Sequence, residues 1–320
     1  MVLPALVAAI WWTFPAERPS LRRGSSELVV AALLLLGFAA FAVSAHPPQA
    51  LDGPWNGLSL RWPENIWTAP WLFLRYIKLL IAPWPLAIDR VVTPITGALA
   101  PRFFIGLFSV LAAALFVLVA RRKNSLSALG VTWLLIAFLP ISNIIPLHNP
   151  VADRYAYALV AGFALLPAAL PLDDRVIRRG VIAIAVVYVA LLELRLPDFA
   201  NDTALWFSNV RVEPHSARAQ TGLGLAAWHS GDLETAIQYF SRADELNPRD
   251  VTAMINLAVM DARTNNLDAA SEKIEEALRR RPDKPEAWAT LALVREAQGR
   301  REEAMEAAEN ARKNDPLGRY

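Results

Sequence analysis

The stretch GDLETAIQYFSRADELNP, residues 231–248, is followed by two related stretches at a fixed interval of 34 residues. They are NNLDAASEKIEEALRRRP at 265–282 and GRREEAMEAAENARKNDP at 299–316. Each of the three ends in proline and has alanine at its sixth and thirteenth positions. A repeat of this period predicts helix pairs that stack into a solenoid, because one pair alone cannot bury its apolar face.

The residues before these stretches follow the same period. A first helix is expected in each copy, with a small packing pair at Leu223-Gly224, Leu257-Ala258 and Leu291-Ala292. With these positions the region resembles three tetratricopeptide repeats, at 217–250, 251–284 and 285–320. Residues 201–216 are expected to form a half-repeat that caps the stack and links it to the preceding chain. The glycines of TGLGLA, residues 221–226, are then packing residues and not a phosphate-binding loop.

Two functions remain open for the repeats. A stack of helix pairs can act as a rigid scaffold, or its concave face can bind a protein or peptide partner. In the second case the first helix of each repeat lines the groove. The predicted groove positions are Arg218, Thr221, Leu225 and Trp228 in the first repeat; Thr252, Ile255, Val259 and Ala262 in the second; and Glu286, Ala289, Leu293 and Glu296 in the third.

Residues 1–200 have the sequence pattern of a transmembrane module. The chain is 55% hydrophobic and 19% charged, and its long apolar runs lie in this part. A crossing helix needs about 20 mainly apolar residues. Five stretches qualify, and with the repeats they predict an all-α protein: Glu27 to Ala45, Phe103 to Ala120, Ala128 to Leu147, Arg154 to Leu170 and Gly180 to Leu196.

Basic residues predict the orientation of these spans. Clusters at 18–23, 121–123 and 175–179 fall on one side if the spans alternate, and basic loops favour the cytoplasm. Residues 66–83 are then expected to lie as a helix in the outer interface, among membrane lipids, without crossing. The repeats are expected on the periplasmic face of a bacterial inner membrane. The opening MVLPALVAAIWWTF is too short to span, and we interpret it as the end of a span whose beginning is missing.

Several kinds of chemistry find no support in the sequence. The chain has no cysteine and four scattered histidines, so no metal site with nitrogen or sulfur ligands is expected. No phosphate loop, nucleophile elbow or dinucleotide motif is present. Up to Val210 there are 16 Lys and Arg against 11 Asp and Glu, but they do not gather on one aromatic-laced face. No nucleic-acid partner is therefore expected.

The stretch HNPVADRYAY, residues 148–157, connects two of the predicted spans. Asn149 suits a helix N-cap and Pro150 the first helical position, so the stretch can be a polar helix start. That reading does not require Arg154, which either pairs with Asp153 or binds the phosphate of a lipid-linked donor. The candidate site residues are His148, Asp153, Arg154, Tyr155 and Tyr157, together with Arg75, Lys78, Asp89 and Arg90 from the earlier polar segment.

Three segments carry a further resemblance: RYIKLLIAPWPLAIDR at 75–90, FLPISNIIPLHNPVADRYAYALVAGF at 138–163, and NDTALWFSNV at 201–210 before the repeats. Together they resemble the C-terminal half of the transmembrane and tetratricopeptide-repeat O-mannosyltransferases and their bacterial relatives, which are glycosyltransferases of the GT-C type. The resemblance implies transfer of a sugar from a polyprenyl-phosphate donor to an acceptor on the non-cytoplasmic face. It also implies that the repeats bind the acceptor or a partner protein.

The same resemblance leaves the catalytic residue unassigned. Enzymes of this type carry an acidic motif in the first outer loop, where it supplies a base or a ligand for a divalent metal, and that region has no counterpart in this sequence. No cofactor is identifiable from the chain itself, and we expect activity only together with the missing N-terminal half. Two alternatives stay open: a membrane-anchored repeat scaffold for cell-envelope assembly, and a polymerase or ligase of surface polysaccharide.

Overall fold

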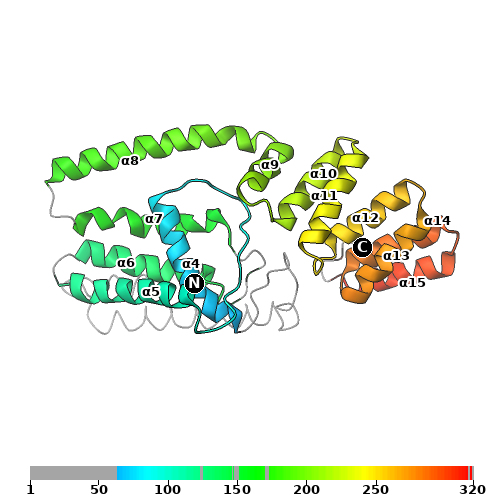
Figure 1. Ribbon diagram of the computed structural model, residues 1–320, viewed down its shortest axis with the longest axis horizontal. Coiled ribbons are helices and arrows are strands. Elements are labelled where there is room, and N and C mark those ends of the chain that lie inside the picture. Colours follow the sequence, from blue (N-terminus) through cyan, green and yellow to red (C-terminus); the bar gives the residue numbers. More distant parts are fainter. Residues whose placement is uncertain are drawn as a thin grey trace. The chain divides into compact units, whose positions relative to one another are not determined.

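The computed structural model describes residues 63–122, 125–145, 147, 151–169, 173–315 and 318. Within these ranges all regular secondary structure is helical (Figure 1). The described residues fall into two compact units that divide between Arg195 and Leu196. The expected first span, Glu27 to Ala45, lies outside the described residues, as does the opening apolar stretch.

The first unit is a bundle of apolar helices joined by 3-10 turns. Its helices are α4 (Glu64–Ile81), α5 (Pro101–Ala120), α6 (Ser125–Phe138), α7 (Tyr157–Ala164) and α8 (Asp174–Arg195), with 3-10 turns at Leu139–Ile141, Asp153–Ala156 and Leu166–Ala169. Pro101 begins α5 because its fixed φ and missing N–H suit the first helical position. Figure 1 shows α4 running across the direction of α5, α6 and α7.

Helix α4 supplies much of the core of this unit. Leu72, Phe73 and Tyr76 are each at most 2% exposed and pack with Phe138 of α6 and Leu159 of α7. The Phe73 and Phe138 rings meet edge to face at 5.2 Å between centroids, a favourable aromatic geometry. A helix expected to lie in a membrane interface is thus packed against its neighbours along one face.

Buried polar groups on α4 hold three connecting segments. The Asn65 side chain donates to the Ile144 carbonyl at 2.7 Å, and the Thr68 hydroxyl accepts the Ile95 N–H at 2.8 Å. The Tyr76 hydroxyl lies 3.5 Å from the Ala152 carbonyl. Each bond satisfies a polar group that would be costly to bury alone. The loops before α5, after α6 and before α7 are therefore fixed on one helix.

Two glycines allow one close helix contact in the first unit. A Cβ on Gly130 of α6 would lie 2.6 Å from the carbonyl oxygen of Gly162 in α7, and a Cβ on Gly162 equally close to the Gly130 oxygen. Side chains at either position would push the helices apart. Small residues at such crossings are typical of helices that pack in membranes.

The helix lengths differ from the expected spans. Two described stretches, Pro101–Ala120 and Arg178–Phe199, are long and apolar enough to cross a membrane, by length and composition alone. In the expected span 128–147, the α-helix ends at Phe138, because Pro140 opens a 3-10 turn and Asn143 takes a positive φ of 60°. In the expected span 154–170, the α-helix covers only Tyr157–Ala164. Five crossing helices are thus not shown.

Helices α5 and α8 leave large apolar side chains uncovered. Phe108 of α5 is 72% exposed, and Val186 of α8 is 63% exposed. A contact between α8 and the rest of its unit is the Tyr188 hydroxyl, which donates to the Leu80 carbonyl at 2.6 Å. Extended apolar surface of this kind marks an interaction face rather than ordinary protein surface.

The second unit is a stack of helix pairs. After a 3-10 turn at Leu196–Phe199 come α9 (Asp202–Val212), α10 (Ala217–His229), α11 (Leu233–Leu246), α12 (Thr252–Arg263), α13 (Leu267–Arg280), α14 (Pro285–Ala297) and α15 (Arg301–Lys313). Asn201, Ser216 and Asp232 cap the N-termini of α9, α10 and α11 with their side chains. The turns inside the three pairs contain Gly231, Asn265 and Gly299, each with positive φ.

The predicted packing positions form the core of this stack. Ala236, Phe240 and Ala243 of α11 are at most 2% exposed, and their equivalents Ala270, Ile274 and Ala277 in α13 are fully buried. A Cβ on Gly224 would lie 2.5 Å from the Phe240 ring, and one on Gly222 would lie 2.5 Å from Nε1 of Trp206 in α9. The prediction that these glycines serve packing is confirmed. Trp206 also shows how α9 covers the end of the stack at α10.

Candidate functional site

An ion pair joins two polar segments of the first unit that are far apart in sequence. Arg90 follows α4 in the segment 83–95, and Asp153 opens the 3-10 turn before α7. The Nε of Arg90 donates to Oδ1 of Asp153, and a terminal nitrogen donates to Oδ2 at 2.8 Å. The two side chains are 13% and 10% exposed. A two-pronged, largely buried pair of this kind fixes direction as well as distance.

Backbone groups complete this junction. The Ala87 N–H donates to Oδ2 of Asp153 at 2.5 Å, so the carboxylate accepts three hydrogen bonds. The same Arg90 donates to the Pro85 carbonyl at 2.7 Å, and its backbone N–H donates to the Val151 carbonyl at 3.3 Å. Because both carboxylate oxygens accept hydrogen bonds, Asp153 has a structural role as the partner of Arg90. It is poorly placed to act as a general base.

The expected helix start at Pro150 is wrong. Ala152 is extended, with φ −141° and ψ 140°, and the first helical turn begins at Asp153. The chain stays extended there because Val151 bonds with Arg90 and Asp153 reaches the same residue. His148, Asn149 and Pro150 lie outside the described residues.

Arg154 does not form an ion pair with the adjacent Asp153. Asp153 binds Arg90, and the Arg154 guanidinium lies over the Tyr155 ring, 5.2 Å from its centroid. In the part of the chain that the structure describes, Arg154 forms no ion pair, and it is exposed. A guanidinium stacked on an aromatic ring keeps its N–H edge available for an anion.

The other candidate residues take different positions around this junction. Arg75 donates to the Val91 carbonyl at 3.2 Å, which ties α4 to the segment 83–95. Asp89 is 4% exposed, whereas Lys78 is exposed and Tyr157 is 80% exposed. Sequence reasoning missed Tyr76 beside Ala152, where burial raises the pKa of the phenol and keeps it neutral. The structure thus brings Arg75, Arg90 and Asp153 into one junction.

The predicted groove residues of the repeats are not equally accessible. Ile255 is 8% exposed and belongs to the core between the second and third repeats, while Leu293 is 66% exposed. Thr252 is engaged by Asp250, which accepts its hydroxyl at 2.6 Å. Arg218, Thr221, Leu225, Trp228, Val259, Ala262, Glu286 and Ala289 are half-buried, and Glu296 is exposed.

Arg263 contacts the predicted groove residue Trp228, although Arg263 was not among the groove positions predicted from the sequence. It follows Ala262 at the end of α12, and its guanidinium lies over the Trp228 ring at 5.2 Å. Trp228 also stacks on His229, with 6.0 Å between the ring centroids. The sequence signal was available, since Arg263 lies one repeat period after His229.

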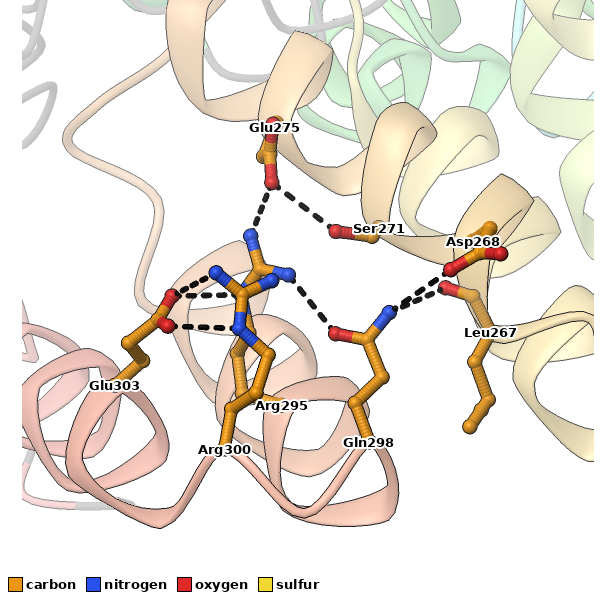
Figure 2. Close-up of polar contacts among 8 residues, drawn as sticks. All are labelled: Leu267, Asp268, Ser271, Glu275, Arg295, Gln298, Arg300 and Glu303. Atoms are coloured by element: carbon orange, nitrogen blue, oxygen red, sulfur yellow. Dashed lines mark hydrogen bonds and ion pairs between the residues drawn. The ribbon is translucent and has the colours of Figure 1, made fainter.

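A polar network connects the second and third repeats (Figure 2). The buried guanidinium of Arg295 in α14 pairs with Glu275 of α13 and with Glu303 of α15 at 3.4 Å. It also donates to the Gln298 side-chain oxygen at 2.8 Å, and Gln298 in turn lies 3.3 Å from the Leu267 carbonyl. Two carboxylates offset the cost of burying one guanidinium, so this network is a structural tie between helices.

A shallow polar cleft lies beside this network. Its volume is about 510 Å³, and it sits where the turn between α12 and α13 meets the turn between α14 and α15. The lining residues are Asn265, Asn266, Leu267, Asp268, Gln298 and Arg300. In the described ranges no three or more His, Asp and Glu side chains gather in a way that could hold a metal. No residue here is therefore assigned to the metal that the family resemblance implies.

Comparison with protein-family profiles identifies the repeats. The sequence profile of the tetratricopeptide repeat family matches residues 203–251 and 255–318. This region is therefore a tetratricopeptide-repeat solenoid, the type of domain that takes part in protein–protein interaction. The match begins inside α9, so the profile includes the helix that covers the first repeat.

Comparison with solved structures finds a distant likeness, and two examples have TM-scores below 0.5. A crystal structure of MamA is 25% identical over 38% of this chain and 71% of that chain, with a TM-score of 0.32. YrrB, described as a TPR protein with an unusual peptide-binding site, is 16% identical over 65% of this chain and 87% of that chain, with a TM-score of 0.31.

One curated relative shares sequence with about half of the chain. It is protein O-mannosyl-transferase Tmtc3 of Drosophila melanogaster, 30% identical over 166 residues. The match covers 48% of this chain and 17% of Tmtc3. The similarity is therefore distant and partial.

Proposed function

We propose that this chain is the C-terminal part of a membrane glycosyltransferase of the GT-C type. In this proposal the first unit binds the phosphate of a polyprenyl-phosphate sugar donor, and the repeats bind the acceptor or a partner protein. The observation that carries it is Arg154, an exposed guanidinium with no ion-pair partner in the described residues, beside a junction of two polar segments. The partial similarity to Tmtc3 supports the reaction class.

The membrane part of the proposal rests on exposed apolar surface. Helices α5 and α8 meet the length and composition needed for crossing, and their large apolar side chains point away from the bundle. Water disfavours such surface, whereas lipid accepts it at no cost. The shorter helices α6 and α7, extended by the 3-10 turns at Leu139–Ile141 and Leu166–Ala169, would carry the chain across the module and back.

The proposed location follows from the same elements. Basic residues Arg121 and Arg122 follow α5, and Arg175, Arg178 and Arg179 lie in the first part of α8. Placing these ends in the cytoplasm puts the Arg90–Asp153 junction and the repeats on the periplasmic side of a bacterial inner membrane. A periplasmic reporter fused after Tyr320 should be active there; activity only with a cytoplasmic reporter would contradict this topology.

The enzymatic proposal is tested by Arg154→Ala in the full-length protein. Sugar transfer from a polyprenyl-phosphate donor should fall at least tenfold, because one charge-assisted contact to phosphate is lost and about 1.4 kcal/mol corresponds to a factor of ten. Lys284→Ala, a cation of the repeats, serves as the control. Unchanged transfer by the Arg154 variant would contradict the phosphate-binding role.

A second candidate is a membrane-anchored repeat scaffold. Leu293 and Met305, on the two helices of the third repeat, are 66% and 67% exposed, which favours a protein surface that is covered in an assembly. If the chain acts only as a scaffold, deleting it should leave lipid-linked sugar transfer intact. Leu293→Glu should then abolish copurification of a partner.

A further inference from the structure

We propose that Arg90 sequesters the Asp153 carboxylate and thereby keeps Arg154 available for a lipid phosphate. The inference rests on the proposed function, because it explains how the phosphate-binding residue of that site stays uncompensated. Arg90 is a positioning residue in this account and does not itself bind the phosphate. Its effect passes through Asp153 to the adjacent Arg154.

The Asp153 carboxylate is held by several hydrogen bonds. Asp153 accepts from two nitrogens of Arg90 and from the Ala87 N–H. The pair is 13% and 10% exposed, so solvent screens it little. The carboxylate is held toward the segment 85–90, and the backbone bond between Arg90 and Val151 holds the two segments in register.

Arg154 would be the nearest alternative partner of this carboxylate in sequence. Asp153 and Arg154 are adjacent in sequence, and a free carboxylate beside an exposed guanidinium forms an ion pair at little conformational cost. Such a pair would neutralise Arg154 before any ligand arrived. Because Arg90 occupies the carboxylate, Arg154 instead lies over Tyr155 and keeps its positive charge facing solvent. The three charged groups together carry one net positive charge.

The surroundings of Arg154 and Arg90 in the sequence indicate the chemistry of the ligand. Uncovered apolar and aromatic side chains occur in both segments that the junction joins: Ile81 at 66% and Trp84 at 54% exposure precede Arg90, and Tyr157 at 80% follows Arg154. A lone guanidinium fits one phosphate group, and exposed apolar side chains fit a hydrocarbon tail. The ligand class is therefore an isoprenyl phosphate, and a membrane phospholipid would share its phosphate chemistry.

The test measures binding of farnesyl phosphate to the full chain in detergent. Arg154→Ala should weaken binding about tenfold, as should Arg90→Ala, because the released Asp153 then neutralises Arg154. Asp153→Asn should bind nearly as well as the wild type, since no carboxylate remains to compete. The double variant Arg90→Ala with Asp153→Asn should recover most of the affinity lost in Arg90→Ala.

This rescue separates sequestration from a purely structural pair. If the pair only stabilised the fold, Asp153→Asn would weaken binding as much as Arg90→Ala, and the double variant would be no better; that result overturns the inference. Arg211→Ala, which breaks the Arg211–Asp198 pair in the second unit, is the matched control and should leave affinity unchanged. Size-exclusion profiles of each variant establish that the fold is retained.

Two further arms distinguish the possible failures. Wild-type affinity in Arg154→Ala would overturn both the phosphate-binding proposal and this inference, whereas a failed rescue with weakened Arg154→Ala would overturn the inference alone. Farnesol and inorganic phosphate should each bind far more weakly than farnesyl phosphate. Equal affinity for phosphatidic acid would keep the sequestration but overturn the assignment to a polyprenyl donor.

Discussion

Arg90 and Asp153 lie 63 residues apart in the sequence and form a two-pronged ion pair that is almost closed to solvent. The pair leaves Arg154, the neighbour of Asp153, stacked on Tyr155. The pair therefore holds Asp153 inside the junction, while the adjacent Arg154 stays exposed.

Removing the carboxylate should loosen the segment that it holds. Asp153→Ala removes the carboxylate partner of the largely buried Arg90 guanidinium, which costs about 3 kcal/mol of unfolding free energy in the first unit. The Ala87 N–H loses its acceptor and should exchange with solvent faster. Hydrogen exchange of residues 84–91 in detergent checks this, with Arg154→Ala as the control that should not change it. Equal protection in both variants would contradict the assigned role of Asp153.

The exposed apolar face of α5 gives a direct test of membrane insertion. Phe108→Arg should reduce insertion, because a central arginine costs about 3 kcal/mol in a crossing helix. Leu293→Arg is the matched control, since Leu293 is about as exposed as Phe108 but lies in the repeats. Since the chain has no cysteine, a single cysteine placed at Arg122 can report its side of the membrane. It should become accessible to a membrane-impermeant thiol reagent from the periplasm in the first variant and not in the second. Equal labelling of the two variants would contradict a crossing by α5.

The close contact of Gly222 with Trp206 predicts a strong effect of one methyl group. Gly222→Ala should destabilise the repeats by about 1–3 kcal/mol, because the new Cβ would overlap the indole ring and displace α9 from α10. Gly231→Asn is the control, since nothing lies within 4 Å of its Cβ position and asparagine tolerates positive φ. Limited proteolysis of residues 202–313 measures the effect of both substitutions. Equal resistance of the two variants to the protease would show that overlap with the indole ring does not destabilise the repeats.

The positive φ of Asn265, in the turn between α12 and α13, predicts different effects on stability for two substitutions at this position. Asn265 has a φ of 60°, and the equivalent turns use Gly231 and Gly299. Asn265→Gly should therefore be neutral or slightly stabilising, whereas Asn265→Val should cost about 1–2 kcal/mol because a β-branched residue fits this region poorly. Thermal unfolding of the two variants should separate them, and identical midpoints would mean that the turn adopts another conformation.

Asp244 in α11 predicts a pH-dependent gain in stability. Burial raises the pKa of its carboxyl, against the opposing effect of Arg280 and with smaller contributions from Asp250 and Glu245. Its charged form therefore disfavours the folded state above the folded pKa, and the penalty disappears as pH falls toward the ordinary, unfolded value. Asp244→Asn should raise the melting temperature at pH 7 and lose that advantage on acidification. A gain that is constant with pH would point to another cause.

The sequence by itself determined the repeats. Their helix pairs depend on contacts between residues close in the chain, so alanines such as Ala236 and Ala270, 34 residues apart, report the packing directly. The glycines of α10 were assigned to packing for the same reason, and Gly222 and Gly224 do meet aromatic rings. Because these contacts are local and periodic, they produce a sequence pattern that can be recognised in a single sequence.

The tertiary structure alone decided the polar junction and the ends of the apolar helices. Asp153 could be assigned to Arg154 or to the helix dipole from sequence, because its actual partner Arg90 is distant in the chain and follows no period. Ala152 is extended for the same reason, since long-range bonds override a local preference for a helix start. Hydropathy fixed where apolar residues lie, but the 3-10 turn at Leu139–Ile141 and the positive φ of buried Asn143 interrupt the expected span 128–147. Long-range polar contacts depend on which segments lie next to each other in the folded protein. The sequence alone does not show which segments these are.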